Sequence, residues 1–149
     1  MPIEIASFNH TNLTVRDLDR VVAFFVEGCG FELLSRGPRD GKLVGRMTAL
    51  GEVDIEIAYV QGPGHRIELI TYRKPEPEVV AARFCDAGAH HVAFDVRDMA
   101  GAIATAGDFG FKLVGDVIAI DGGPNAGRKV AYVRDADGLV VEFLELAKG

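Results

Sequence analysis

Apolar and polar residues alternate one by one in some segments of this chain and recur at helical spacing in others. These two kinds of segment follow each other in the same order in each half. An alternating run follows His10 and another follows His91, and strict alternation predicts a β-strand. In the first run, Leu13 and Val15 lie on the face opposite His10, because successive side chains of a strand point to opposite sides. His91 has the same relation to the apolar residues of its own run. Each histidine is therefore expected on the strand face that does not pack against a helix.

Helical spacing follows each of these runs. Residues 18–27 carry apolar side chains three and four positions apart, and residues 99–109 form a weaker, alanine-rich counterpart. Asp17 and Asp98 stand directly before these segments, where aspartate is a favoured N-cap. Each predicted helix ends near a glycine, which is typical of a helix C-terminus.

Three further strands are predicted in each half, so the order of elements is β-α-β-β-β. The strands lie near residues 31–36, 46–60 and 65–73 in the first half, and near residues 111–120, 128–134 and 139–146 in the second. Asp137 and Gly138 stand between the last two runs, and this dipeptide favours a hairpin turn.

The two halves also match residue by residue, which indicates an internal repeat. The segment that starts at His10 aligns without gaps on the segment that starts at His91. A Gly-Phe pair follows each predicted helix, and Glu68 and Glu142 occupy equivalent positions in the last run of each half. Three matched blocks in the same order indicate two copies of one structural unit.

We therefore predict a single domain, residues 1–149, built from two tandem modules. The first covers about residues 5–73 and the second about residues 87–147, with a linker at about residues 74–86 whose prolines and charges disfavour a continuing strand. Within the linker region, residues 79–87 are compatible with a short helix or with an extended crossing.

Composition and charge exclude several classes of function. Apolar residues make up 48% and charged residues 26% of the 149, which is ordinary for a globular protein. The net charge of -6 gives no electrostatic attraction to nucleic acid, and no apolar run is long enough for a membrane span. Because the sequence shows no secretory signal, we expect a cytoplasmic protein in which Cys29 and Cys85 are reduced.

The repeated His/Glu pair is the main candidate for chemistry. Glu68 and Glu142 are each flanked by apolar neighbours, and a lone buried carboxylate is costly without a partner. Imidazole nitrogen and carboxylate oxygen together suit divalent Zn, Ni, Co, Mn or Fe. The pattern therefore predicts one divalent metal ion held by four ligands: His10, Glu68, His91 and Glu142.

Each of these residues has a plainer interpretation when taken singly. A histidine at a strand start is usually a satisfied polar residue, and a glutamate in an edge strand usually faces water. The repetition of the pair favours the metal site. His90 competes with His91, but the gapless alignment and the strand alternation both favour His91. His65 is expected to be a loop residue.

The same residues resemble the vicinal oxygen chelate superfamily, which contains glyoxalases, bleomycin resistance proteins and dioxygenases. The resemblance covers nearly the whole chain. It rests on a His-x-x-Leu-x-Val-x-Asp-Leu-Asp opening at His10, the Gly-Phe pair after the helix, and an Asp-x-Asp-Gly-x-x-x-Glu ending at Glu142. It implies an α+β fold in which two tandem βαβββ modules form a curved, barrel-like mixed sheet around a metal site.

The ligand set narrows this resemblance. Extradiol dioxygenases and fosfomycin-modifying transferases of the superfamily use two histidines and one glutamate, and bleomycin-binding members lack the ligands. The His/Glu/His/Glu order here is similar to bacterial glyoxalase I, whereas methylmalonyl-CoA epimerase commonly has Gln where Glu68 stands. The resemblance thus implies Ni, Co, Zn or Mn rather than Fe. Around residues 36–51 nothing is assignable to glutathione recognition.

The resulting hypothesis is a divalent-metal-dependent isomerase, epimerase or lyase. A small substrate would chelate the ion through two vicinal oxygens, and removal of a proton would give a metal-stabilised enediolate. The resemblance implies that Glu142 is the base, with Glu68 opposite. The alternatives are an Fe(II) ring-cleaving dioxygenase and a non-catalytic resistance protein that binds a small molecule or antibiotic. Shared fold alone does not decide among them.

Strand alternation nominates substrate contacts on the faces that carry the ligands. These are Asn12, Thr14, Ile70 and Tyr72. Weaker candidates are Tyr59, Met47 and Asp95, and Arg128 and Lys129 follow a glycine-rich loop where they could meet an anionic substrate.

The exposed sheet edges of paired modules also favour a homodimer. Neither nucleic acid nor a membrane is expected as a partner.

Overall fold

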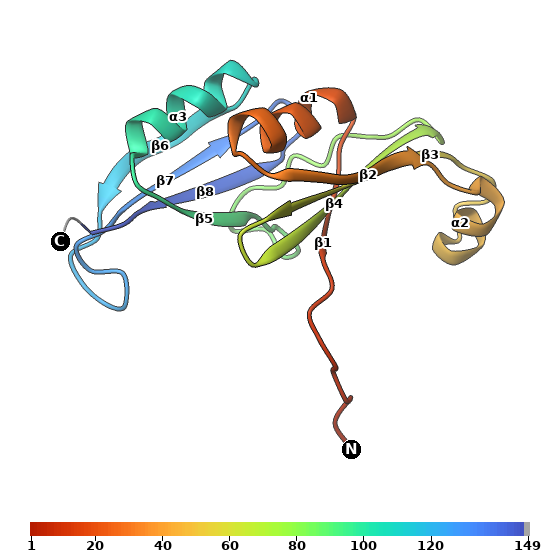
Figure 1. The fold of residues 1–149 in the computed structure, drawn as a ribbon, viewed down its shortest axis with the longest axis horizontal. Helices are drawn as coiled ribbons and strands as arrows, with labels where there is room; N and C mark the ends of the chain where they lie inside the picture. The colour runs from red at the N-terminus through yellow and green to blue at the C-terminus, as the bar shows by residue number, and fades with distance from the viewer. Residues whose placement is uncertain (148–149) are drawn as a thin grey trace. The chain divides into compact units, whose positions relative to one another are not determined.

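A computed structural model describes residues 1–147 and divides into two compact units, each built around one four-stranded mixed sheet (Figure 1). The first unit spans Met1–Pro77 and the second begins at Glu78. The predicted α+β class and the repeated modules are confirmed. Each sheet is curved and open, with an edge strand on either side.

The first unit has its strands in the order β1-β4-β3-β2, with β1 parallel to β4 and the other pairs antiparallel. Its elements are β1 (Thr11–Thr14), α1 (Leu18–Ala23), the π-helical turn η1 (Phe24–Gly28), β2 (Glu32–Pro38), α2 (Gly41–Thr48), β3 (Asp54–Gly62) and β4 (His65–Lys74).

Helix α1 begins where the sequence predicts. The side chain of Asp17 accepts a hydrogen bond from the backbone N–H of Arg20 at 2.9 Å, and this satisfies one of the free donors of the first turn. Val21 and Phe25 are fully buried as the helix packs on β3 and β4. The chain then leaves the π-helical turn through Gly30, whose φ of +71° is a conformation that glycine adopts without strain.

The two faces of the first sheet differ in what covers them. Helix α1 covers the face that carries buried Leu13, Val60 and Leu69. The opposite face, which we call the Glu68 face, carries a buried cluster with partly exposed neighbours. The cluster is Val53, Ile55 and Ile57, and the neighbours are Val44, Tyr59, Ile70 and Tyr72.

Helix α2 was not predicted, and the strand predicted at residues 46–60 is wrong in its first part. The Asp40 side chain caps this helix by accepting hydrogen bonds from the next backbone N–H groups, at 2.9 and 3.1 Å. Gly45 lies so close to the following turn that a Cβ there would come 1.5 Å from the Gly51 carbonyl oxygen. Glycine disfavours a helix on propensity, so the close packing that requires it also hides the helix in the sequence.

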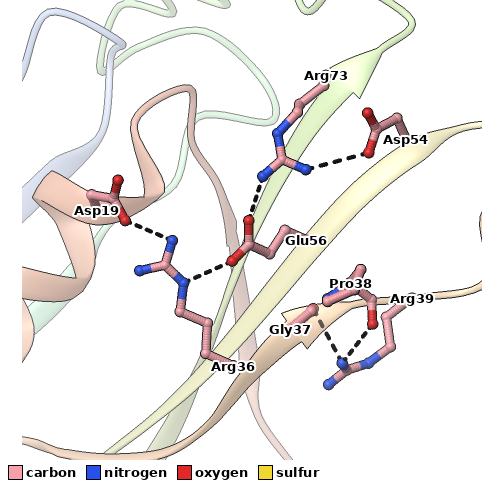
Figure 2. Close-up of polar contacts among 8 residues, drawn as sticks. All are labelled: Asp19, Arg36, Gly37, Pro38, Arg39, Asp54, Glu56 and Arg73. Atoms are coloured by element: carbon pink, nitrogen blue, oxygen red, sulfur yellow. Dashed lines mark hydrogen bonds and ion pairs between the residues drawn. The ribbon is translucent and has the colours of Figure 1, made fainter.

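An ionic network joins α1 to β2, β3 and β4 on the α1-covered side of the sheet (Figure 2). Arg36 contacts Asp19 at 2.6 Å and Glu56 at 2.8 Å, and Arg73 contacts Glu56 from the other side. Arg73 also reaches Asp54 at 3.3 Å. Hydrogen bonds first from Arg36 and then from Arg73 hold the pKa of Glu56 below its ordinary value of 4.5.

The Glu56→Gln variant is expected to lose about 1 kcal/mol of unfolding free energy at pH 7. Because the pKa of Glu56 is lower in the folded state, the unfolded chain binds more protons, and the contribution is complete above pH 4.5. It disappears as the pH falls toward the folded-state pKa, so the two proteins should converge in acid. Urea denaturation of the two proteins at pH 7 and at an acidic pH measures the difference in unfolding free energy.

The control is Glu32→Gln, at an exposed position of β2. This change should alter the unfolding free energy by less than about 0.5 kcal/mol. An equal loss for Glu56→Gln at neutral and acidic pH would show that the carboxylate charge is not responsible.

The second unit repeats the strand pattern in the order β5-β8-β7-β6, with β5 parallel to β8. Its elements are β5 (Val92–Val96), α3 (Met99–Asp108), β6 (Lys112–Ala119), β7 (Lys129–Arg134) and β8 (Val140–Glu145). Asp98 occupies the N-cap position of α3, but its side chain makes no capping hydrogen bond there. The predicted hairpin turn is confirmed, since Gly138 has a φ of +86°.

Helix α3 contacts β6, β7 and β8 on the face that carries buried Val133, Val141 and Phe143. The opposite face carries Glu142 and is called the Glu142 face below. Residues 79–87 form neither a helix nor a strand. Phe84 of that segment packs against Tyr132 with ring centroids 5.0 Å apart, so the segment covers part of the Glu142 face.

Two further features bear on the cellular setting. Cys29 and Cys85 are free, and burial raises the pKa of the Cys29 thiol to about 11, so it is protonated at neutral pH. Within residues 1–147, no helix has the length and apolarity needed to cross a bilayer. The cytoplasmic location stays a prediction.

Candidate metal centre

The parallel pairing of β1 with β4 brings the first His/Glu pair together. Asn12 lies opposite Glu68 in this register, and His10 directly precedes β1. The Nε2 atom of His10 lies 2.8 Å from the Oε2 atom of Glu68. Glu68 is buried, with 8% of its surface exposed, whereas the His10 side chain is 31% exposed, so the pair lies at the margin of the sheet where solvent reaches the imidazole. Two residues far apart in sequence thus meet at one end of the sheet.

The second unit forms the same contact from its own first and last strands. Ala93 lies opposite Glu142 in the parallel register, and His91 directly precedes β5. The Nε2 atom of His91 lies 2.9 Å from the Oε2 atom of Glu142. The sequence repeat therefore corresponds to a repeated side-chain contact, with the same atoms in each unit.

The other two histidines do not join these pairs. His90 is exposed, and its Nδ1 atom lies 3.3 Å from the backbone oxygen of Gly88. His65 is the first residue of β4 rather than a loop residue, and its Nε2 atom lies 2.8 Å from the hydroxyl of Thr11. Its ring also contacts Phe8, with centroids 5.0 Å apart.

A tyrosine accompanies each His/Glu pair. Tyr59 lies opposite Glu68 in the antiparallel register and donates a hydrogen bond from its hydroxyl to Oε1 at 2.8 Å. Its ring meets the His10 ring edge-on, with centroids 5.8 Å apart and planes at 82°. Burial and the Glu68 hydrogen bond raise the pKa of Tyr59 above its ordinary value. The phenol therefore stays protonated and remains a donor at neutral pH.

Tyr132 has the corresponding position in the second unit, and the sequence interpretation missed it. It lies opposite Glu142, and its ring meets that of His91 with centroids 5.4 Å apart and planes at 86°. Burial first, then the charge and hydrogen bond of Glu142, raise the pKa of Tyr132. A signal was present, because the tripeptide Ala-Tyr-Val occurs at both Tyr59 and Tyr132.

The donor atoms of each pair fit a divalent cation. Imidazole nitrogen and carboxylate oxygen are ligands that divalent Zn, Ni, Co and Mn accept, and each pair brings one of each together, at 2.8 and 2.9 Å. The Nδ1 atom of His10 lies 2.6 Å from the side-chain oxygen of Asn9. If Nδ1 donates its proton to Asn9, Nε2 presents a lone pair toward the Glu68 carboxylate, and a cation satisfies both.

Each unit supplies two of the four predicted ligands. In the part of the chain from 1 to 147, no group of three or more His, Cys, Asp or Glu side chains lies together as a metal site. The four residues thus form two pairs of the same geometry. Their joint coordination of a single ion stays a prediction.

The predicted substrate contacts lie where the alternation places them. Asn12 and Thr14 are exposed, and Asn12 donates to the Glu68 backbone oxygen at 3.5 Å while accepting from the Thr14 hydroxyl at 3.2 Å. Ile70 and Tyr72 lie on the Glu68 face beside its apolar cluster. Their contact with a substrate stays a prediction.

Arg128 is engaged by its own unit. Its guanidinium pairs with Asp95, donates to the Asn125 side chain at 3.1 Å, and reaches the Glu145 backbone oxygen at 3.5 Å. Lys129 lies 3.5 Å from the Glu145 carboxylate. An anionic substrate at Arg128 would have to compete with Asp95, which weakens the case for an anion site there.

Comparison with known proteins places this arrangement in a family. The sequence pattern of the glyoxalase/bleomycin resistance protein/dioxygenase superfamily matches residues 9–132. The chain belongs to this superfamily. A superfamily relative from an Actinomyces species, 2-epi-5-epi-valiolone epimerase, is 31% identical over 146 residues, which are 95% of this chain and 80% of the relative.

Two solved structures share the fold. A glyoxalase family protein from Bacillus cereus has a TM-score of 0.82 and 28% identity, with coverage of 98% of this chain and 97% of that one. A fosfomycin resistance protein from Listeria monocytogenes has a TM-score of 0.62 and 14% identity, with coverage of 98% and 95%. The second likeness concerns the fold alone.

Proposed function

We propose that this protein is a divalent-metal-dependent epimerase or isomerase that acts on a small molecule carrying a carbonyl group. The observation that carries the proposal is the same His–Glu contact in each unit, at 2.8 and 2.9 Å. The likeness to an epimerase over 95% of the chain supports epimerisation in particular. The lyase alternative has no comparable support.

The residues that would hold the ion are His10, Glu68, His91 and Glu142. Their nitrogen and oxygen atoms suit Ni, Co, Zn or Mn, and superfamily members commonly bind a divalent metal. When bound, the ion supplies Lewis-acid polarisation of two neighbouring substrate oxygens. Glu142 and Glu68 would do more than hold the ion, because each carboxylate can also accept and release a proton.

The proton transfer is assigned to these two carboxylates. An ionised Glu142 forms an O–H bond with the proton on the carbon next to the carbonyl, and the electron pair of the broken C–H bond delocalises onto the carbonyl oxygen. A protonated Glu68 returns a proton to that carbon on the opposite face, which inverts its configuration. Where the carbon that loses its proton also carries a hydroxyl group, that hydroxyl gives its proton to the former carbonyl oxygen, and return of the carbon-bound proton to the former carbonyl carbon gives a 1,2-shift. In both cases atoms and charge balance without any oxidant.

The test is proton–deuterium exchange, followed by NMR in deuterated water. The protein is loaded separately with Ni, Co, Zn, Mn and Fe, and offered 2-epi-5-epi-valiolone, other α-hydroxy-ketones and acyl thioesters. Deuterium should enter at one carbon of the substrate, with inversion of its configuration. Removal of the metal by a chelating agent should stop this exchange. Oxygen consumption with Fe(II), or the absence of exchange with every metal and substrate, would reject the proposal.

The assembly is part of the proposal. Each four-stranded sheet ends in edge strands, which are β1 and β2 in the first unit and β5 and β6 in the second. Edge strands offer unsatisfied backbone groups for association, and most soluble oligomers are symmetric homo-oligomers. These features support a homodimer that takes a small-molecule substrate.

A further inference from the structure

Each glutamate carboxylate contacts a histidine and lies opposite a tyrosine. In the first unit, Oε2 of Glu68 faces His10 at 2.8 Å, while Oε1 accepts the hydroxyl of Tyr59 at 2.8 Å. In the second unit, Oε2 of Glu142 faces His91 at 2.9 Å, and Tyr132 lies directly opposite Glu142 across β7 and β8. In each unit one oxygen is therefore directed to the histidine, and a phenol stands beside the carboxylate, with a hydrogen bond of 2.8 Å from Tyr59 to Glu68.

We propose that Tyr59 and Tyr132 are positioning residues of the metal centre, each fixing the carboxylate of its own unit so that a single oxygen faces the ion. This inference rests on the proposed metal-dependent function. The phenol restrains rotation of the carboxylate about its last bond, which favours one-oxygen coordination over two. A ligand used through one oxygen keeps room for substrate and can detach to take a proton.

The strand register explains why the tyrosines can do this. Tyr59 and Glu68 are direct partners across β3 and β4, and Tyr132 and Glu142 are direct partners across β7 and β8. Direct cross-strand partners have Cβ atoms about 5 Å apart on the same face, which is within reach of a phenol–carboxylate hydrogen bond. The backbone therefore sets the distance, and no loop movement is needed.

Each tyrosine also restrains the histidine of its pair. The ring planes lie at 82° for Tyr59 and His10, and at 86° for Tyr132 and His91. An edge-on contact of this kind is a favoured aromatic geometry and limits rotation of the imidazole. One side chain thus orients both donor groups of its unit.

A role in packing alone would not require the hydroxyl. Each glutamate also has a cross-strand partner in the first strand of its unit, and this partner differs between the units. It is Asn12 for Glu68 and Ala93 for Glu142. The tyrosine is nevertheless present in both. Phenylalanine would fill the same space, so the hydroxyl is the part of the side chain that the proposal concerns.

The experiment compares metal affinity in the full-length protein and in the Tyr59→Phe and Tyr132→Phe variants. Co(II) is the probe, titrated into metal-free protein and followed by calorimetry and by its ligand-field absorption. Each variant is expected to bind Co(II) about 10-fold more weakly, with a changed absorption spectrum, because partners of metal ligands typically contribute 10- to 100-fold in affinity. The double variant should show approximately the product of the two effects.

Tyr72→Phe is the matched control for metal affinity. Tyr72 lies on the Glu68 face, in the same strand as Glu68 and two residues beyond Ile70, and its cross-strand partner is Ile55 rather than a predicted ligand. Its Co(II) affinity should stay within about twofold of the unmodified protein. Unchanged affinity and spectrum in either Tyr59→Phe or Tyr132→Phe would overturn the inference while leaving the proposed function intact. Failure of the unmodified protein to bind any divalent metal would overturn both.

Discussion

Replacing Glu142 with Gln is expected to slow turnover by a factor of about 10² to 10⁴ while the protein still binds its metal. The amide keeps an oxygen that can coordinate a cation, but it cannot accept the substrate proton at neutral pH. The rate of deuterium incorporation measures the loss, and elemental analysis after dialysis measures the metal that stays bound. Wild-type turnover in this variant would show that Glu142 is not the base.

Two comparisons sharpen this result. Glu145 lies on the same strand but alternates to the opposite face, beside Lys129, so Glu145→Gln should keep full turnover. Glu68→Gln should behave differently from both. If Glu68 returns the proton, its amide variant still allows exchange with solvent through Glu142, but the configuration of the substrate carbon is retained.

Replacing His91 with Ala is expected to lower metal affinity by more than about 100-fold, since a ligand contributes more than the groups that hydrogen-bond to ligands, whose loss typically costs 10- to 100-fold. His90→Ala is a matched control, because the two histidines are adjacent in sequence and their side chains point to different neighbours. His91 faces Glu142 at 2.9 Å, whereas His90 lies near the Gly88 carbonyl oxygen. Metal content after dialysis and turnover should both fall only for His91→Ala. The reverse order would mean that the gapless repeat alignment identifies the wrong histidine.

Much of the fold could be predicted because the chain is an internal repeat. Two weak strand and helix patterns that agree with each other carry more information than either one alone. The alternation of Leu13 and Val15 with exposed neighbours was sufficient to orient His10, and the structure confirms that both apolar side chains are buried. The His–Glu contact within each module follows from that orientation together with the parallel pairing of first and last strands.

The features that local sequence patterns do not predict depend on tertiary contacts. Helix α2 is short and contains Gly45, which its close approach to Gly51 requires, so local propensity opposes it. Tyr132 looked like an ordinary strand residue until the β7–β8 register placed it opposite Glu142. Strand register depends on which residue of one run meets which residue of another, and hydrophobic periodicity does not determine that.

The pairing of the first strand of each module with its last strand has a consequence for the order in which the protein folds. Asn12 and Glu68, which meet across β1 and β4, are 56 residues apart along the chain. On the ribosome, the histidine of a module must therefore wait until almost the whole module has been synthesised before its glutamate arrives. Contacts of such long range slow folding, because the chain between them must be ordered first. A cation that needs the completed pairs of both modules would then bind only to the finished protein, and would add about 2.7 kcal/mol of stability at 100 times its dissociation constant.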